Sequence, residues 1–255
     1  MELEKIYEMF DEDSRLSKTQ ANTVEFITTI NYIDKHLKKE DKILDIGAGT
    51  GAYSIHYANK GYDVTAVEPV KKNLDILKSK ITSDMNIEAK LGNALDLSEY
   101  EDNVFDLILC LGPLYHLHSK EEQIRCINEL KRVCKDDGVI FIAYISNDMV
   151  IVTESFRYNS NFLLSDHYNH ETFKVNDNPF VFFTVESFRS LMKETSLEKI
   201  TEFAAEGLSE LLHEEINRLP EEQFEEWLRY HKYVCEKEHM LGYSNHIVFI
   251  AKNKN

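Results

Sequence analysis

Residues 43–51 constrain this 255-residue chain more than any other segment, because a strand pattern, a glycine turn and a helix start follow one another directly. The short apolar run that ends at Ile46 is typical of a strand buried on both faces of a parallel sheet. Three glycines stop the run, and a helical pattern covers residues 53–59. Glycine has no Cβ atom, so the backbone of this turn can adopt positive φ and let a ligand lie against its amides.

The spacing of the turn glycines limits which class of ligand the turn can bind. The dinucleotide fingerprint is GxGxxG, which brings a pyrophosphate to a helix N-terminus. Here Gly47, Gly49 and Gly51 give GxGxG after the acidic Asp45, so the third glycine comes one residue early. The pattern predicts a nucleotide-like ligand and disfavours the alternative of a nicotinamide-dependent oxidoreductase.

Apolar runs recur along the chain and alternate with helical patterns. An amphipathic helix is predicted at residues 20–37, before the first strand. Further strands are predicted at residues 64–67, 87–91, 105–111, 139–145, 197–203 and 246–251. Together with the first strand, they predict a doubly wound, Rossmann-like α/β fold with a mostly parallel seven-stranded sheet and helices on both faces.

We expect a single domain over residues 1–255, with N-terminal helices at 1–38 and a cofactor-binding core at 39–145. Residues 146–184 are rich in aromatic, Asn, Asp and Ser residues and have no clear period, which favours a lid-like insertion; the alternative is that the rings fill a satellite core. Residues 185–255 form the C-terminal part, with acidic helices and a closing strand.

Charge and composition exclude several classes of partner. Lys and Arg number 29 against 45 Asp and Glu, and the net charge of −16 repels nucleic acid and anionic lipid. Residues 1–4 are acidic, unlike a signal peptide, and the longest apolar run is far shorter than the roughly 20 residues of a membrane span, so we expect a cytoplasmic protein. The four cysteines form no CxxC pair, and the histidine pairs 116/118 and 167/170 lack further ligands, so no metal site is expected.

Polar or small residues end or follow two further predicted strands. Glu68 ends the second strand, where a carboxylate can accept two hydrogen bonds from a ribose diol. Asn93 and Ala94 follow the third strand, where a side-chain oxygen and the next amide suit an adenine edge. Because the carboxyl ends of parallel strands meet at one edge of the sheet, these residues should surround one ligand.

These elements, in this order, resemble the class I S-adenosylmethionine-dependent methyltransferases, and the likeness covers residues 40–145. The resemblance implies S-adenosylmethionine as the cofactor. It implies that the methionine moiety is lined by Gly47, Ala48 and Gly49, in a loop organised by Asp45. It further implies that Glu68 holds the ribose, that Asn93 and Ala94 hold the adenine, and that the backbone of Cys110 and Leu111 holds the amino group. Many members have Asp where this chain has Asn93.

Residues 11–16, 24–29 and 112–117 resemble a bacterial small-molecule branch of these enzymes. A guanidinium near the carboxylate of the cofactor is a recurring need, which makes Arg15 a candidate. The alternative is a surface arginine paired with Asp11 or Asp13.

In-line methyl transfer needs mainly alignment and exclusion of water. Tyr115 and His116 are the candidates to orient or deprotonate an acceptor, against the alternative of a packing or capping role; His213, His231 and His246 are further candidates. We expect a small-molecule acceptor between residues 112–118, 146–183 and 214–230. The alternatives are a protein acceptor, or a cofactor-binding protein without catalysis that acts through a partner. The sequence predicts no oligomeric state.

Overall fold

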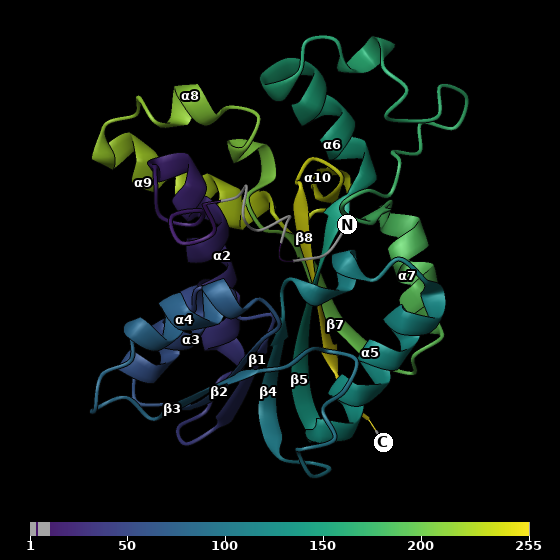
Figure 1. Cartoon of the computed structure of the whole chain (residues 1–255). Coiled ribbons are helices and arrows are strands. Elements are labelled where there is room, and N and C mark those ends of the chain that lie inside the picture. The colour runs from purple at the N-terminus through teal and green to yellow at the C-terminus, as the bar shows by residue number, and fades with distance from the viewer. Residues whose placement is uncertain (1–3, 5–10, 255) are drawn as a thin grey trace.

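The computed structural model describes residue 4 and residues 11–254, and a twisted sheet forms its centre (Figure 1). The strand order is β3-β2-β1-β4-β5-β8-β7, with a short β6 paired to the end of β5. The strands are β1 (Lys42–Ile46), β2 (Asp63–Glu68), β3 (Ile87–Leu91), β4 (Phe105–Cys110), β5 (Cys134–Ser146), β6 (Phe182–Phe183), β7 (Glu198–Ala204) and β8 (His246–Lys252). β1 to β5 pair in parallel, whereas β8 runs antiparallel to both β5 and β7. The mostly parallel sheet predicted from the sequence is confirmed.

Helices cover both faces of the sheet because successive strand residues point to opposite sides. Ile140, Ile142 and Tyr144 of β5 pack into one buried cluster, and the intervening Phe141 and Ala143 pack into another. The first cluster includes residues of α5 (Lys120–Val133) and α7 (Val185–Lys193), and the second includes residues of α2 (Gln20–His36) and α3 (Ala52–Asn59). α4 (Lys71–Ser79) contacts β2 and β3. None of the described helices is both long and apolar enough to span a bilayer.

The insertion, residues 146–184, stands above the carboxyl ends of the parallel strands (Figure 1). It contains α6 (Asn147–Thr153), a π-helical turn η2 (Glu154–Tyr158), a 3-10 turn η3 (Phe162–Leu164) and β6. Phe162, Tyr168 and Val175 form a small buried cluster of its own. Some of the aromatic residues therefore fill a satellite core, and the lid function stays a prediction.

The C-terminal part adds helices beside the N-terminal one. These are the 3-10 turn η4 (Gly207–Ser209), α8 (His213–Ile216), α9 (Glu221–Val234) and α10 (Glu238–Leu241). Ile216 and Phe224 pack against Ala21 and Val24 of α2, so α8 and α9 bury their apolar faces on that helix. Of the predicted N-terminal helical region, residues 1–3 and 5–10 lie outside the described residues.

Candidate functional site

The glycine turn forms the floor of the site between β1 and α3. Gly47 and Gly49 have φ of +70° and +55°, a left-handed conformation that L side chains rarely adopt. A Cβ atom on Gly47 would also come within 2.9 Å of the Pro113 ring. Glycine is therefore required both for the conformation and for the close approach of the next loop.

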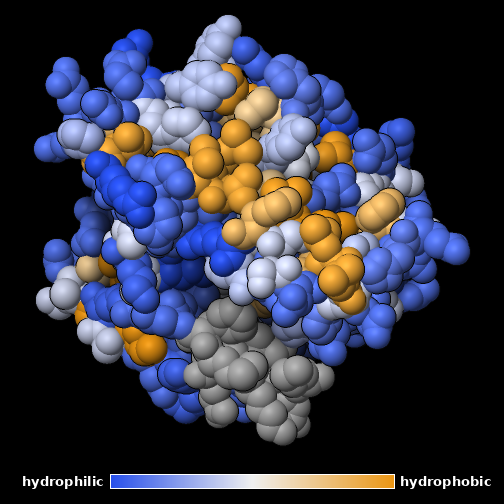
Figure 2. Space-filling model, turned by 90° about the horizontal axis from the view of Figure 1, so that it is seen from above, coloured by the Kyte–Doolittle hydropathy of each residue, from blue (hydrophilic) through white to orange (hydrophobic). Residues whose placement is uncertain are grey.

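A cavity of about 390 Å³ opens above this turn, at the carboxyl ends of β1 to β4. It brings together all the predicted site residues except Cys110: Arg15, Asp45, Gly47, Ala48, Gly49, Glu68, Asn93, Ala94, Leu111, Tyr115 and His116. We call it the first cavity. Figure 2 looks onto this end of the molecule and shows a hollow with hydrophilic residues in its depth and hydrophobic residues along one side.

Glu68 lies at the end of β2 and is only 3% exposed. Its Oε2 accepts a hydrogen bond from the amide of Gly49 at 2.8 Å, and its Oε1 accepts one from the amide of Val70 at 2.9 Å. Burial raises the pKa of this carboxyl to about 7 although both amides stabilise its ionised form. The carboxylate thus adjoins the glycine turn, within reach of the hydroxyls of a ribose bound on that turn.

Asp45 ties the end of β1 to the helix that follows the turn. Its Oδ2 accepts a hydrogen bond from the hydroxyl of Ser54 in α3 at 2.5 Å, and burial raises its pKa to about 6. This contact joins the two ends of the glycine turn, which is the position that a residue organising the loop would need.

The predicted adenine and amino-group contacts are only partly supported. Asn93 is exposed, and its Oδ1 already accepts a hydrogen bond from the amide of Leu95 at 2.8 Å. The side chain of Cys110 packs in the core, and the cavity wall is formed by Leu111 and Gly112 instead. The roles of Asn93 and of the Cys110 backbone stay predictions.

Arg15 is half-buried between two carboxylates. Its Nη1 donates to Glu25 at 2.8 Å and its Nε donates to Glu12 at 3.3 Å. Neither Asp11 nor Asp13 is its partner, since these contact Ser14 and Lys80 respectively. The alternative of a surface pair with Asp11 or Asp13 is therefore wrong.

A second cavity of about 490 Å³ adjoins the first, and Glu12, Arg15 and Tyr115 line both. Its other walls come from α2, the insertion, the segment after β7 and the start of β8. Residues 214–230 were expected to form a wall but do not line it, because α8 and α9 pack against α2. Glu206 and Glu210, just before α8, take that place. We call this the second cavity.

Tyr115 and His116 belong to the 3-10 turn η1 (Pro113–His116) that follows β4. The Tyr115 hydroxyl donates to the carbonyl of Leu111 at 3.1 Å, and the Tyr115 carbonyl accepts from the amide of Val181 in the insertion at 2.8 Å. Burial and the charge of neighbouring His118 lower the pKa of His116 to about 4, so its imidazole is neutral at pH 7. Tyr115 thus links the glycine-turn side of the site to the insertion.

The structure separates the three further histidine candidates. His246 lines the second cavity. His213 instead contacts Thr19 at 3.1 Å, and His231 contacts the carbonyl of Ala205 at 3.1 Å. His213 thus joins α8 to the start of α2, and His231 joins α9 to the segment after β7.

The comparisons with known proteins agree with this geometry. Residues 44–142 match a family model described as a methyltransferase domain. An uncharacterised methyltransferase of Schizosaccharomyces pombe is 33% identical over 143 residues, which cover 50% of this chain and 48% of that protein. The matched segment, residues 44–142, is thus identified as an S-adenosylmethionine-dependent methyltransferase domain. The chain spans about half the length of the curated relatives it matches.

A second relative and a solved structure are also similar to this chain. A glycine/sarcosine N-methyltransferase of Aphanothece halophytica is 24% identical over 151 residues, covering 58% of this chain and 56% of that protein. A solved structure from Thermotoga maritima, titled a possible histamine N-methyltransferase, shares the fold with a TM-score of 0.62 at 18% identity, covering 98% of this chain and 99% of that one.

The residues of the first cavity fit S-adenosylmethionine, the cofactor of this family. Residues 47–49 of the glycine turn line the cavity without side-chain atoms beyond Cβ, and the buried carboxylate of Glu68 lies beside them. Carboxyl groups of Glu12, Asp13 and Asp45 also line the cavity, which suits a ligand with a positively charged sulfur and amino group.

Proposed function

We propose that this methyltransferase transfers a methyl group from S-adenosylmethionine in the first cavity to a small-molecule acceptor in the second. The observation that carries the proposal is that the two cavities meet at shared walls, with Tyr115 between them. A volume of about 490 Å³ suits a small molecule.

The chain's own residues have few chemical steps to perform. The bound cofactor supplies a methyl group on a sulfonium, which leaves behind a neutral thioether. The aromatic side chains of Tyr115, Phe180 and Phe182 help to exclude water from the second cavity and to shape it. The neutral imidazole of His116 can accept a hydrogen bond at the junction of η1 with the first cavity.

The relatives support this class of acceptor. The Aphanothece and Thermotoga proteins carry the names of small molecules in their descriptions. The net charge of −16 opposes nucleic acid and anionic membranes as partners.

Labelled S-adenosylmethionine incubated with the protein and a metabolite extract tests the proposal. We expect label in a product of small molecular mass, identified by mass spectrometry, and much less of it with a Glu68→Ala variant at the same cofactor concentration. Label that enters only the protein fraction would indicate a protein acceptor. Binding of the cofactor with no labelled product in either fraction would favour a cofactor-binding protein without catalysis.

Tyr115→Phe and His116→Ala should each lower turnover of the identified acceptor and leave the affinity for S-adenosylhomocysteine unchanged. The first removes the hydroxyl that fixes η1 to the Leu111 carbonyl, and the second removes a neutral imidazole from the cavity wall. Steady-state kinetics beside calorimetry separates lost alignment from lost binding. Unchanged turnover in both variants would remove these side chains from the mechanism.

Affinity for S-adenosylhomocysteine should rise with pH through about 7, where Glu68 ionises. A ribose diol donates to the ionised carboxylate, so protonation at pH 6 should weaken binding by about ten-fold relative to pH 8. Calorimetry at several pH values measures this slope. Glu68→Gln keeps every other titration, including that of Asp45, and should abolish the Glu68 step; the same slope in that variant would contradict the assignment.

A further inference from the structure

We propose that the second cavity recognises its acceptor through a protonated amine, which donates hydrogen bonds to Glu206 and Glu25. The inference rests on the proposed function, because it takes the second cavity to be the acceptor site. It adds the chemical class of the acceptor: a small cation with an apolar or aromatic body. It concerns recognition of the charge and assigns no atom to be methylated.

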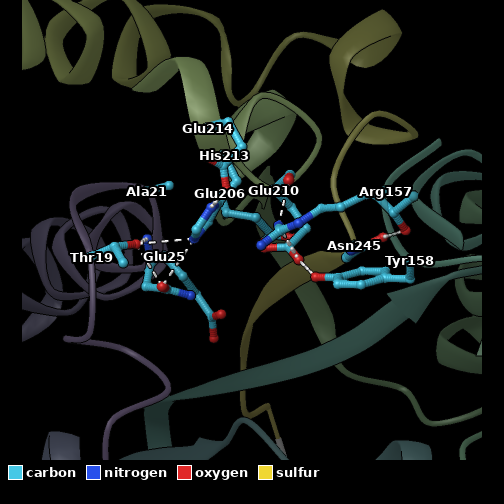
Figure 3. A network of polar contacts seen from close by, with 12 residues as sticks. Thr19, Ala21, Glu25, Arg157, Tyr158, Glu206, Glu210, His213, Glu214 and Asn245 are labelled. Atoms are coloured by element: carbon cyan, nitrogen blue, oxygen red, sulfur yellow. Dashed lines mark hydrogen bonds and ion pairs between the residues drawn. The ribbon is translucent and has the colours of Figure 1, made fainter. Parts of the chain in front are cut away.

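Carboxyl groups dominate the polar lining of the second cavity. Figure 3 shows how they converge: Glu25 comes from α2, Glu206 and Glu210 from the segment after β7, and Arg157 and Tyr158 from the insertion. Among the described residues, five glutamates line the cavity: Glu12, Glu25, Glu154, Glu206 and Glu210. Three basic side chains lie against them: Arg15, His246 and Arg157. The carboxyl groups thus outnumber the basic groups, and a positive ligand would restore the balance.

Glu206 has an oxygen that lacks a donor. The residue is 4% exposed, and its Oε1 accepts a hydrogen bond from the amide of His246 at 2.8 Å. Its Oε2 is buried, and no described residue donates a hydrogen bond to it. A buried carboxylate oxygen without a donor is costly, because nothing replaces the water lost on burial. An ammonium group in the cavity would supply the missing donor.

The basic groups nearest Glu206 and Glu25 do not fill this role. Arg15 reaches Glu25 at 2.8 Å through Nη1, and Nδ1 of His246 lies 3.5 Å from Oε2 of Glu25 and 3.7 Å from Oε1 of Glu206. Burial alone would lower the pKa of His246, but the charges of Glu25 and Glu206 outweigh it and raise this pKa to about 9. The imidazole is therefore already protonated at neutral pH and still leaves Oε2 of Glu206 without a donor.

Glu210 shows the contrast with a satisfied carboxylate. Its Oε1 pairs with Nη1 of Arg157 at 2.6 Å and accepts a hydrogen bond from the hydroxyl of Tyr158. These contacts join the insertion to the segment after β7. The Glu210 carboxylate therefore has its partners in the insertion, whereas Oε2 of Glu206 has no donor among the described residues.

The apolar part of the cavity fits the body of an organic cation. Tyr115, Tyr158, Phe180 and Phe182 line it together with Ile145 and Val150. Aromatic faces attract cations by about 0.5–2 kcal/mol, depending on how far the charge is desolvated. A free carboxylate on the ligand would instead meet Glu25 and Glu206 and be repelled.

A divalent metal ion is the competing occupant. Glu25, Glu206 and His246 each offer a ligand atom, and these atoms lie within 4.8 Å of one another. Nη1 of Arg15 already donates to Oε2 of Glu25 at 2.8 Å, and the same oxygen lies 3.5 Å from Nδ1 of His246. A metal ion between the three ligand atoms would lie beside this guanidinium and be repelled by it. The geometry therefore favours an N–H donor over a metal ion.

Isothermal calorimetry on the S-adenosylhomocysteine-loaded protein tests the proposal with matched probes. Two sets are used: 2-phenylethylamine, 2-phenylethanol and 3-phenylpropionate, and butylamine, butanol and butyrate. We expect at least one amine to bind at least about ten-fold more tightly than its alcohol and its carboxylate, because its hydrogen bonds involve two charged partners.

Glu206→Gln, which keeps the acceptor for the His246 amide, should weaken amine binding about ten-fold or more, and Glu25→Gln should do likewise. Glu214→Gln, an exposed carboxylate outside the lining, is the matched control and should bind like the wild type.

Three outcomes would overturn the proposal: tighter binding of the alcohol or carboxylate, no amine binding in either set, or wild-type amine affinity in Glu206→Gln. Stoichiometric binding of Zn²⁺ by the wild type that Glu206→Gln loses would assign the cluster to a metal instead. S-adenosylhomocysteine affinity, measured first in each variant, reports folding and the first cavity. A wild-type protein that does not bind S-adenosylhomocysteine would contradict the proposed function. A wild-type protein that binds S-adenosylhomocysteine but no amine would contradict only this inference.

Discussion

Replacing Gly49 by valine should abolish detectable binding of S-adenosylmethionine and leave the protein folded. The residue has φ of +55°, and a left-handed conformation costs about 1–2 kcal/mol for a residue with a Cβ atom, and more for a β-branched one. The valine side chain would enter the first cavity beside Glu12, whose Oε1 lies 3.4 Å from the Cβ position. It would also disturb the Gly49 amide that donates to Glu68. Calorimetry measures the binding and thermal denaturation the folding.

Gly61→Val is the matched control. Gly61 has φ of +86°, no described atom beyond its two chain neighbours lies within 4 Å of its Cβ position, and it does not line the first cavity. The Gly61→Val variant should therefore suffer the same kind of backbone strain as Gly49→Val, which lowers its melting temperature. Its affinity for the cofactor should be unchanged. Equal affinity of Gly49→Val and the wild type would show that the cofactor does not lie on this turn.

Glu68→Ala should weaken the binding of S-adenosylmethionine by about 1.5–3 kcal/mol, or roughly 10- to 150-fold. This is the range for hydrogen bonds to a charged group, and the carboxylate is buried beside the glycine turn. The alanine variant also leaves the amides of Gly49 and Val70 without their present acceptor. Calorimetry of the two proteins under one set of conditions measures the difference.

Glu88→Ala serves as the control for charge. Glu88 lies on the neighbouring β3, has a largely exposed side chain and pairs with Lys90 at 3.2 Å outside the cavity. Its loss should leave the affinity within about two-fold, since exposed ion pairs contribute little. An unchanged affinity in Glu68→Ala would remove the ribose assignment.

Local patterns account for most of the fold that was predicted. The buried strands are continuous apolar runs, and the turn between β1 and α3 is written in adjacent residues, so neighbouring sequence was sufficient. β6 was missed because two residues are too few to show a period, and its pairing with β5 depends on the path of the insertion. The insertion has no regular pattern because short turns and a satellite core hold it.

The first cavity could be predicted because each of its main residues follows a recognisable strand. The second could not, because its residues meet only through the tertiary fold. Glu25 lies within the amphipathic helix predicted at residues 20–37 and Glu206 had no local signal, yet the two lie near the same imidazole of His246. The expected wall at residues 214–230 was wrong because the amphipathic faces of α8 and α9 pack on α2.

We expect the cofactor to lie on the glycine turn with its sulfur directed to the second cavity. A crystal structure with S-adenosylhomocysteine would show this arrangement. We predict both ribose hydroxyls on the carboxylate of Glu68, the methionine part against Gly47 and Gly49, and the sulfur facing Tyr115, where the two cavities meet. A ligand bound elsewhere, or one on this turn with its sulfur directed away from Tyr115 and the second cavity, would contradict the account.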